Sequence, residues 1–133
     1  MKLDKFLNAK HIYIIGNGGS ASTANHFAND LLKMSGVRAY SLCANEAIVM
    51  AYGNDNGYDS IFIDQLKVYW EQGDLLVTIS GSGTSKNIVK AKKYIESIGG
   101  QVYSFPTMFE LNCDMQQVEN LHLKLAHDIS QSI

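Results

Sequence analysis

The feature that most constrains the fold is a short apolar run followed by a segment rich in glycine and serine, and it occurs twice. Residues 12–15 (IYII) run into residues 16–20 (GNGGS), and residues 75–79 (LLVTI) run into residues 80–85 (SGSGTS). Short β-rich apolar runs predict buried strands, and the Gly/Ser clusters predict loops. An amphipathic segment follows each loop. The chain therefore alternates strand, loop and helix, which indicates an α/β domain with helices around a parallel sheet.

The remaining elements continue this alternation. At 133 residues, without a linker or an internal repeat, the chain is expected to form one domain over residues 1–133. The expected helices cover residues 20–34, with Ser20 as a candidate cap, and residues 46–52, 60–70, 87–98 and 115–130. The expected strands cover residues 12–15, 39–43, 75–79, 102–105 and 109–113.

The last two strand candidates conflict with an all-parallel sheet. Only residues 106–108 separate the run 102–105 from the run 109–113. A parallel crossover usually needs ~10–12 residues or more. Either the two runs form a hairpin or one of them is not a strand, and both alternatives stay open.

Composition excludes several classes of protein. The net charge of −2, from 11 basic and 13 acidic residues, provides no broad basic surface for direct binding of nucleic acid or of anionic lipid. Cys43 and Cys113 fit no metal-site spacing and are too few for a disulfide framework. No stretch approaches the ~20 apolar residues that span a bilayer. We therefore expect a soluble domain of a reducing compartment, the cytoplasm, without a membrane partner.

The two Gly/Ser loops share a chemistry suited to an anion. Glycine lets backbone N–H groups approach a ligand closely, hydroxyl groups donate hydrogen bonds, and each loop opens a helix at its positive dipole end. Residues 80–85 resemble a phosphate cradle without a cationic anchor. The alternative is two polar turns with ordinary helix caps. Two such loops at equivalent positions in the sheet favour the phosphate interpretation.

Two nucleotide-binding alternatives fit less well. Gly16-x-Gly18-x-x-Ala21 matches a dinucleotide fingerprint, which requires an acidic residue at the end of the second strand. That strand ends in residues 42–44 (LCA), so the acidic residue is missing. A nucleoside triphosphate loop requires a Lys before its Ser/Thr, whereas Lys86 follows the serine.

Four side chains on two predicted helices form a second candidate site. His26 and Asp30 are spaced i, i+4 and share one helix face. Glu119 and His127 are eight residues apart, about 80° around the helix and ~12 Å along it. Two imidazoles and two carboxylates suit zinc, and they also suit a metal-free acid/base pair. The alternative is that they are solvated or bonded to backbone.

Four segments carry a resemblance to a known family. Residues 16–31 (GNGGSASTANHFANDL) resemble the first signature of the sugar isomerase (SIS) domain, and within it the GNGGS…HFAEEL pattern of bacterial phosphoheptose isomerases. Residues 53–58 (GNDNGY) resemble their GNDFGF turn. Residues 73–91 resemble GDVLLGISTSGNSANVIKA, and residues 118–127 (VENLHLKLAH) resemble IQEIHIKVIH. The resemblance covers nearly the whole chain in order.

This resemblance implies a fold, a ligand and a set of site residues. The implied fold is a three-layer α/β/α sandwich with a mostly parallel sheet, and the implied ligand is a phosphorylated sugar. The implied zinc ligands are His26, Asp30, Glu119 and His127, of which Asp30 would also be the catalytic base and His127 its acid/base partner. The implied substrate-binding residues are Asn17, Gly18, Gly19, Ser20, Asp55, Ser80, Gly81, Ser82, Ser85 and Glu119.

Several positions depart from the family pattern. Asp30 replaces a glutamate, Glu119 replaces a glutamine, and Gln116 replaces an aspartate near the sugar. Lys33 and Met34 stand near the position of a family arginine. The long N-terminal helices that help to build the family's tetramer, and its penultimate crossover helix, have no counterpart in this sequence. Because the family's active sites lie between subunits, we still expect a homo-oligomer, either a dimer or a tetramer.

The resemblance leaves three hypotheses for function. The first is an aldose–ketose isomerase that converts sedoheptulose 7-phosphate to a heptose 7-phosphate through an enediol. The second is a non-catalytic SIS module, either a sugar-phosphate sensor or an adaptor like the replication-initiator-associating relatives. The third is a degraded or truncated paralogue. The replication-initiator-associating relatives lack the C-terminal histidine. The presence of His127, together with a carboxylate at Asp30, therefore favours the isomerase hypothesis.

Overall fold

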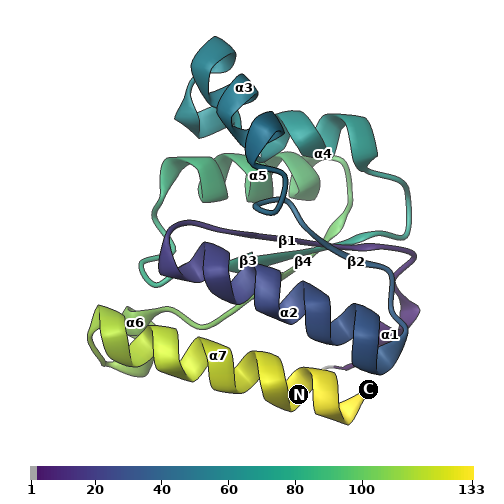
Figure 1. Ribbon diagram of the computed structural model, residues 1–133, viewed down its shortest axis with the longest axis vertical. Coiled ribbons are helices and arrows are strands. Elements are labelled where there is room, and N and C mark those ends of the chain that lie inside the picture. The colour runs from purple at the N-terminus through teal and green to yellow at the C-terminus, as the bar shows by residue number, and fades with distance from the viewer. Residues whose placement is uncertain (1–2) are drawn as a thin grey trace.

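The computed structural model describes residues 3–133 and contains one parallel sheet. The sheet crosses the middle of the molecule, with helices on both sides (Figure 1). Its strand order is β2-β1-β3-β4, and every recorded pairing is parallel. The strands are β1 (Ile12–Gly16), β2 (Ala39–Ser41), β3 (Leu75–Ile79) and β4 (Gln101–Ser104).

Helices cover both faces of the sheet, which confirms the expected three-layer α/β/α arrangement. Helices α2 and α7 lie together on one face, and α4 and α5 lie on the other (Figure 1). Across residues 3–133, no helix combines the length and the apolar character needed to cross a membrane. The helices are α1 (Asp4–Asn8), α2 (Gly19–Ser35), α3 (Glu46–Asn56), α4 (Ile63–Tyr69), α5 (Lys86–Ser97), α6 (Met108–Leu111) and α7 (Met115–Ser132), with a 3-10 turn η1 (Tyr58–Ser60).

The alternation of side chains along β1 explains why this strand is apolar throughout. Ile12 and Ile14 pack into the core beneath α2 and α7, whereas Tyr13 and Ile15 pack into the core beneath α4 and α5. All five residues of β1 are buried, as are all five of β3. A strand covered on both faces needs a continuous apolar run, and this is the pattern that the sequence shows.

Helix α3 is longer than expected and contacts the core through half-buried side chains, among them Val49 and Tyr52. It begins where the Asn45 side chain accepts a hydrogen bond from Ile48 N, and it ends at Gly57, whose φ is +92°. It therefore runs through part of the segment that was expected to be a turn. It buries none of its residues, and Figure 1 shows it at the outer end of the molecule. The helix expected over residues 60–70 is divided into η1 and α4.

The strand expected over residues 109–113 is wrong, because α6 occupies this segment. Thr107 and Glu110 form a reciprocal capping box that starts α6, and Asn112, at φ +51°, ends it. Asp114 and Gln117 form a second capping box that starts α7. Two local capping signals thus outweigh the β-propensity of the short apolar run. The conflict between the last two strand candidates disappears, because β4 is the last strand within residues 3–133.

Strand β4 forms one edge of the sheet, and α1 protects it. The Lys5 Nζ donates a hydrogen bond of 3.2 Å to the carbonyl oxygen of Val102 in the middle of β4. Phe6, also on α1, is 1% exposed and packs edge-on against the rings of Phe27 and Tyr103. The buried Phe6 therefore places the lysine of α1 beside the open edge.

Candidate active site

A cavity of about 300 Å³ lies where β1 and β3 end, between their loops and the start of α7. Its wall contains all the predicted substrate-binding residues except Asp55, together with Met115. In an open α/β sheet, this edge is where ligands bind. The lining residues are Asn17, Gly18, Gly19, Ser20, Ser80, Gly81, Ser82, Ser85, Met115 and Glu119.

The first loop turns so tightly that its glycines are required. A Cβ on Gly16 would lie 2.6 Å from the carbonyl oxygen of Ser20, and Gly18 has a φ of +55°. Helix α2 begins at Gly19 with Gly18 as its N-cap, and no side chain caps it. The expected cap by Ser20 is therefore wrong, because Ser20 lies inside the first turn. The N–H groups of Ser20 and Ala21 already donate to the carbonyl oxygens of Asn17 and Gly18, which leaves those of Gly18 and Gly19 for an anion.

The second loop presents serine hydroxyl groups that are oriented by their own backbone. The Ser80 Oγ accepts a hydrogen bond of 2.9 Å from Gly83 N. The Ser82 Oγ accepts hydrogen bonds from Thr84 N, at 3.2 Å, and from the Thr84 hydroxyl, at 3.1 Å. Because both serine oxygens act as acceptors here, their own hydroxyl hydrogens can be donated to a ligand. Ser85, at the N-terminus of α5, makes no side-chain capping bond.

Helix α7 closes the cavity with Met115 and Glu119. The Glu119 carboxylate lies against the backbone of Gly19, where an added Cβ would be 2.6 Å from its Oε2. Gly19 begins α2, and a carboxylate is stabilised at the positive end of a helix dipole. Glu119 therefore acts as part of the cavity wall in this structure.

His26, Asp30 and His127 meet where α2 packs against α7. The Asp30 Oδ2 lies 3.3 Å from His26 Nε2 and 3.9 Å from His127 Nε2, and the two Nε2 atoms are 3.1 Å apart. The Asp30 side chain is 15% exposed, whereas His26 and His127 are 49% and 43% exposed. The group is thus open to solvent and is anchored by a mostly buried carboxylate.

The geometry of these three atoms fits a metal ion. Ligands at 2.0–2.1 Å around a tetrahedral Zn²⁺ lie ~3.4 Å from one another. The three observed separations of 3.1, 3.3 and 3.9 Å bracket this value, and the atoms form a group that could hold an ion. The fourth predicted ligand, Glu119, lies outside this group. The structure therefore brings together three of the four residues predicted to bind zinc.

Asp55 lies apart from the cavity wall. It is exposed near the end of α3, where its Oδ1 accepts a hydrogen bond from the Asn54 side chain. Its role in binding a sugar stays a prediction.

Three residues that the sequence does not predict for the site contact it from distant parts of the chain. Asn87 is 2% exposed and pairs with Asn17, and Tyr58 also bonds to Asn17. The Cys43 thiol donates to the carbonyl oxygen of Gly16 at 3.1 Å, and burial raises the pKa of this thiol. Asn87 could have been suspected, because it is a polar residue that closely follows the serine-rich loop. The sequence around Tyr58 and Cys43 carries no comparable signal.

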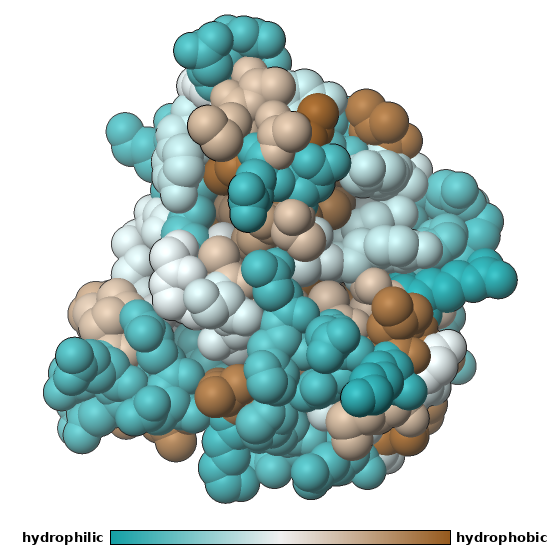
Figure 2. Space-filling model, in the orientation of Figure 1, coloured by the Kyte–Doolittle hydropathy of each residue, from teal (hydrophilic) through white to brown (hydrophobic). Residues whose placement is uncertain are grey.

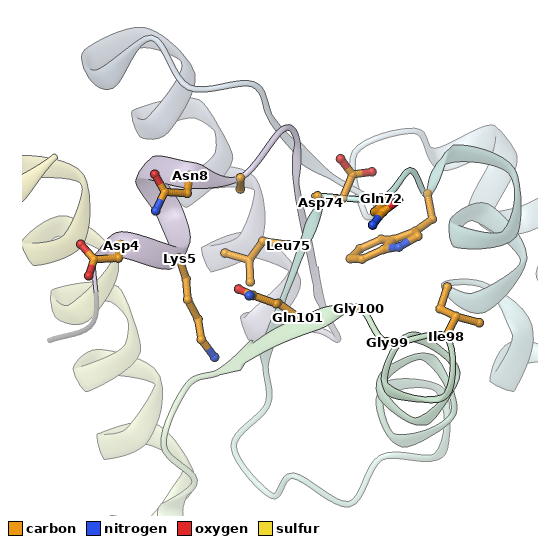
Figure 3. A pocket seen from close by; sticks show the side chains of 13 residues that line it. Asp4, Lys5, Asn8, Gln72, Asp74, Leu75, Ile98, Gly99, Gly100 and Gln101 are labelled. Atoms are coloured by element: carbon orange, nitrogen blue, oxygen red, sulfur yellow. The ribbon is translucent and has the colours of Figure 1, made fainter.

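A larger cavity, of about 750 Å³, lies at the opposite end of the strands and contains none of the predicted site residues. Figure 3 shows Asp4, Lys5 and Asn8 of α1 on one side of it and Gln72 and Ile98 on the other. Asp74, which also lines it, is buried and accepts hydrogen bonds from His11 N and from Glu71 N. Its position at the starting ends of β3 and β4 separates it from the candidate active site.

Comparison with known proteins identifies relatives of this chain. The SIS domain model matches residues 3–106. A phosphoheptose isomerase of Campylobacter concisus is 32% identical, and the match covers 100% of this chain and 80% of the relative. A phosphoheptose isomerase of Helicobacter pylori is 39% identical over 73% of this chain, which corresponds to 53% of that relative.

Solved structures agree with this result. The phosphoheptose isomerase of Neisseria gonorrhoeae is 28% identical and superimposes with a TM-score of 0.84, covering 98% of this chain and 79% of that one. The Vibrio vulnificus NanR protein complexed with ManNAc-6P, at 17% identity, 51% coverage of its own length and a TM-score of 0.66, shares the fold alone. With a family match over most of its length and a matching architecture, the chain belongs to the SIS domain family.

Proposed function

We propose that this chain is a phosphosugar isomerase that converts sedoheptulose 7-phosphate to a heptose 7-phosphate. One observation carries the proposal: α2 and α7 each contribute to the cavity and also to the group of His26, Asp30 and His127. The same two helices therefore connect an anion-binding cavity to acid/base side chains. The relatives named phosphoheptose isomerase support the substrate class.

The phosphoryl group would bind in the cavity. The hydroxyl groups of Ser80, Ser82 and Ser85 and the N-termini of α2 and α5 all supply donors there. Hydrogen bonds from neutral donors to an anion are charge-assisted and about twice as strong as neutral ones. No cation is needed when several such donors converge.

Replacing Ser82 by Ala tests this assignment. The variant loses one charge-assisted hydrogen bond, so the Kd for sugar phosphates should rise by roughly 5- to 30-fold, equivalent to ~1–2 kcal/mol. Titration calorimetry measures this change. Ser97→Ala, at the far end of α5, is the matched control and should leave the Kd unchanged. Unaltered binding in Ser82→Ala would show that the loop is only a turn.

Acid/base chemistry would take place at the other end of the substrate. Asp30 would take the proton from the carbon next to the carbonyl group, which gives an enediol, and this proton would return to the former carbonyl carbon. His127 would move a proton between the two enediol oxygens. An imidazole and a carboxylate suit these roles because a positioned side chain of either type can accept a proton from a reacting group and return it.

The same residues would hold a metal ion. His26, Asp30 and His127 supply two imidazoles and one carboxylate, a donor set typical of zinc sites that keep an open position. A bound zinc ion polarises the oxygens of a carbonyl compound as a Lewis acid. The positive charge of such an ion would also offset the negative charge of the Asp30 carboxylate.

A panel of phosphorylated sugars tests the proposed function. The purified protein is incubated with C5, C6 and C7 ketose phosphates, and the aldose products are measured in a coupled assay. We expect turnover with the C7 substrate, abolished by His127→Asn. Binding without turnover of any sugar would favour the sensor hypothesis, and neither binding nor turnover would refute both.

We also propose that the chain forms a homo-oligomer. Apolar side chains are exposed on α3 and α6, including Met50 at 71% and Phe109 at 69%. Around α3, hydrophobic residues lie among hydrophilic ones on the surface (Figure 2). Light scattering should give the mass of a dimer or tetramer. A fully active monomer would refute this proposal.

A further inference from the structure

Three side chains from separate parts of the chain form one hydrogen-bonded network beside the cavity. The Asn17 Nδ2 donates to Asn87 Oδ1 at 2.8 Å, and the Asn87 Nδ2 donates back to Asn17 Oδ1 at 2.9 Å. The Tyr58 hydroxyl donates to the same Asn17 Oδ1 at 2.9 Å. Asn17 follows β1, Asn87 lies in the first turn of α5, and Tyr58 begins η1. Three segments therefore meet at a single side-chain amide.

The network fixes the orientation of the Asn17 amide. Its carbonyl oxygen accepts two hydrogen bonds, which uses both lone pairs, and its nitrogen donates one of its two hydrogens to Asn87. One N–H remains free, and Asn17 lines the cavity together with the serine hydroxyls. An amide held in this way offers the ligand a donor and no acceptor.

The two partners of Asn17 hold it from different surroundings. Asn87 is 2% exposed, so its amide has little access to solvent and depends on Asn17 for its hydrogen bonds. Tyr58 is 60% exposed, and it follows α3, which buries no residue. The Tyr58 hydroxyl thus ties the outlying α3–η1 segment to the wall of the cavity.

We propose that Asn87 and Tyr58 are positioning residues of the substrate site, which hold the Asn17 amide so that its free N–H faces an oxygen of the ligand's phosphoryl group. The inference rests on the proposed function. The phosphoryl group is the chemical match for the part of the wall formed by Asn17 and the serine hydroxyls, which supply hydrogen-bond donors. The Glu119 carboxylate, which also lines the cavity, is an acceptor and takes no part in holding the anion. Neither Asn87 nor Tyr58 takes part in the proton transfers.

Tyr58→Phe provides the direct test, since it removes one oxygen atom from an exposed side chain. The hydrogen bond that is lost should raise the Kd of inorganic phosphate, and the KM of the sugar phosphate, by roughly 2- to 12-fold, with kcat within about twofold of the original. Tyr69→Phe, 49% exposed at the end of α4, is the matched control and should change neither constant. An unchanged Kd and KM in Tyr58→Phe, or a fall in kcat alone, would overturn the inference.

Asn87→Leu tests whether the two residues act through the same amide. Leucine keeps the approximate shape of the side chain without its polar atoms, and it should weaken phosphate binding more than Tyr58→Phe does. Once Asn87 is gone, Asn17 is no longer held, so adding Tyr58→Phe should change the Kd by less than about twofold. Fully multiplicative effects would contradict shared positioning. If Asn87→Leu fails to fold, Tyr58→Phe alone decides the matter.

The binding measurement separates this inference from the proposed function. Calorimetry with inorganic phosphate needs no turnover, so it reports on Tyr58 even if the chain isomerises none of the sugars. If wild-type protein binds phosphate and turns over sugar phosphates, but Tyr58→Phe is unchanged, only the positioning role fails. If wild-type protein binds phosphate without turnover, only the isomerase proposal fails.

Discussion

Replacing His127 by Asn should lower kcat for sugar-phosphate isomerisation by roughly 10²- to 10⁴-fold, the contribution of a positioned acid/base group. Asparagine keeps a hydrogen-bonding side chain of similar size but cannot carry a proton between two oxygens. Phosphate binding should stay within about twofold, because His127 is absent from the lining of the cavity. Steady-state kinetics together with phosphate calorimetry measure both effects.

The neighbouring carboxylate provides the control for this variant. Asp128 bonds to Lys124 on the exposed side of α7, so Asp128→Asn should retain full activity. A folded His127→Asn protein with near-normal turnover would remove His127 from the mechanism. The non-catalytic sensor would then be the better hypothesis.

Asp30→Ala should abolish stoichiometric zinc binding as well as turnover. Even residues that only support a metal ligand change affinity by 10–100-fold, so removing the shared carboxylate should exceed ~100-fold. Without it, His26 and His127 retain only two imidazole nitrogens, 3.1 Å apart. Elemental analysis of the purified variant, after dialysis against a weak chelator, gives the zinc content.

Glu119→Gln distinguishes a three-residue set from a four-residue set of ligands. Because the Glu119 carboxylate lies against Gly19 and outside the group around Asp30, we expect this variant to keep its zinc. Loss of zinc from Glu119→Gln would show that Glu119 turns toward the metal in solution. If wild-type protein takes up no zinc at all, Asp30 and His127 would have to act as a metal-free pair.

The layered architecture was predictable because its signals are local and periodic. Residues 12–15 and 75–79 are almost entirely apolar, as strands buried on both faces require, and the glycine-rich loops mark their ends; the exception is Thr78, whose hydroxyl bonds to Ser104. The incorrect strand at residues 109–113 has a local cause as well. The apolar composition of this run favours a strand, whereas the capping residues Thr107 and Asp114 on either side of it favour helices.

The site was predictable only in part, because its contacts depend on how helices pack. The spacing of His26 and Asp30 puts both on one face of α2, and the approach of α7 then adds His127. Spacing along α7 also suggested Glu119, but its side chain turns toward Gly19 instead. The bonds from Tyr58 and Asn87 to Asn17 span 41 and 70 positions, so no sequence period can reveal them.

The exposed edge of β4 bears on how this protein behaves at high concentration. An unpaired strand edge can add a strand from another molecule and so begin aggregation. Here the edge strand is four residues long, and the Lys5 ammonium group already occupies the Val102 carbonyl. An incoming strand would either have to break the hydrogen bond from Lys5 to this carbonyl or bury the lysine charge beneath it. This device acts at β4 alone and disfavours the addition of a foreign strand there, whereas the opposite edge of the sheet is formed by β2.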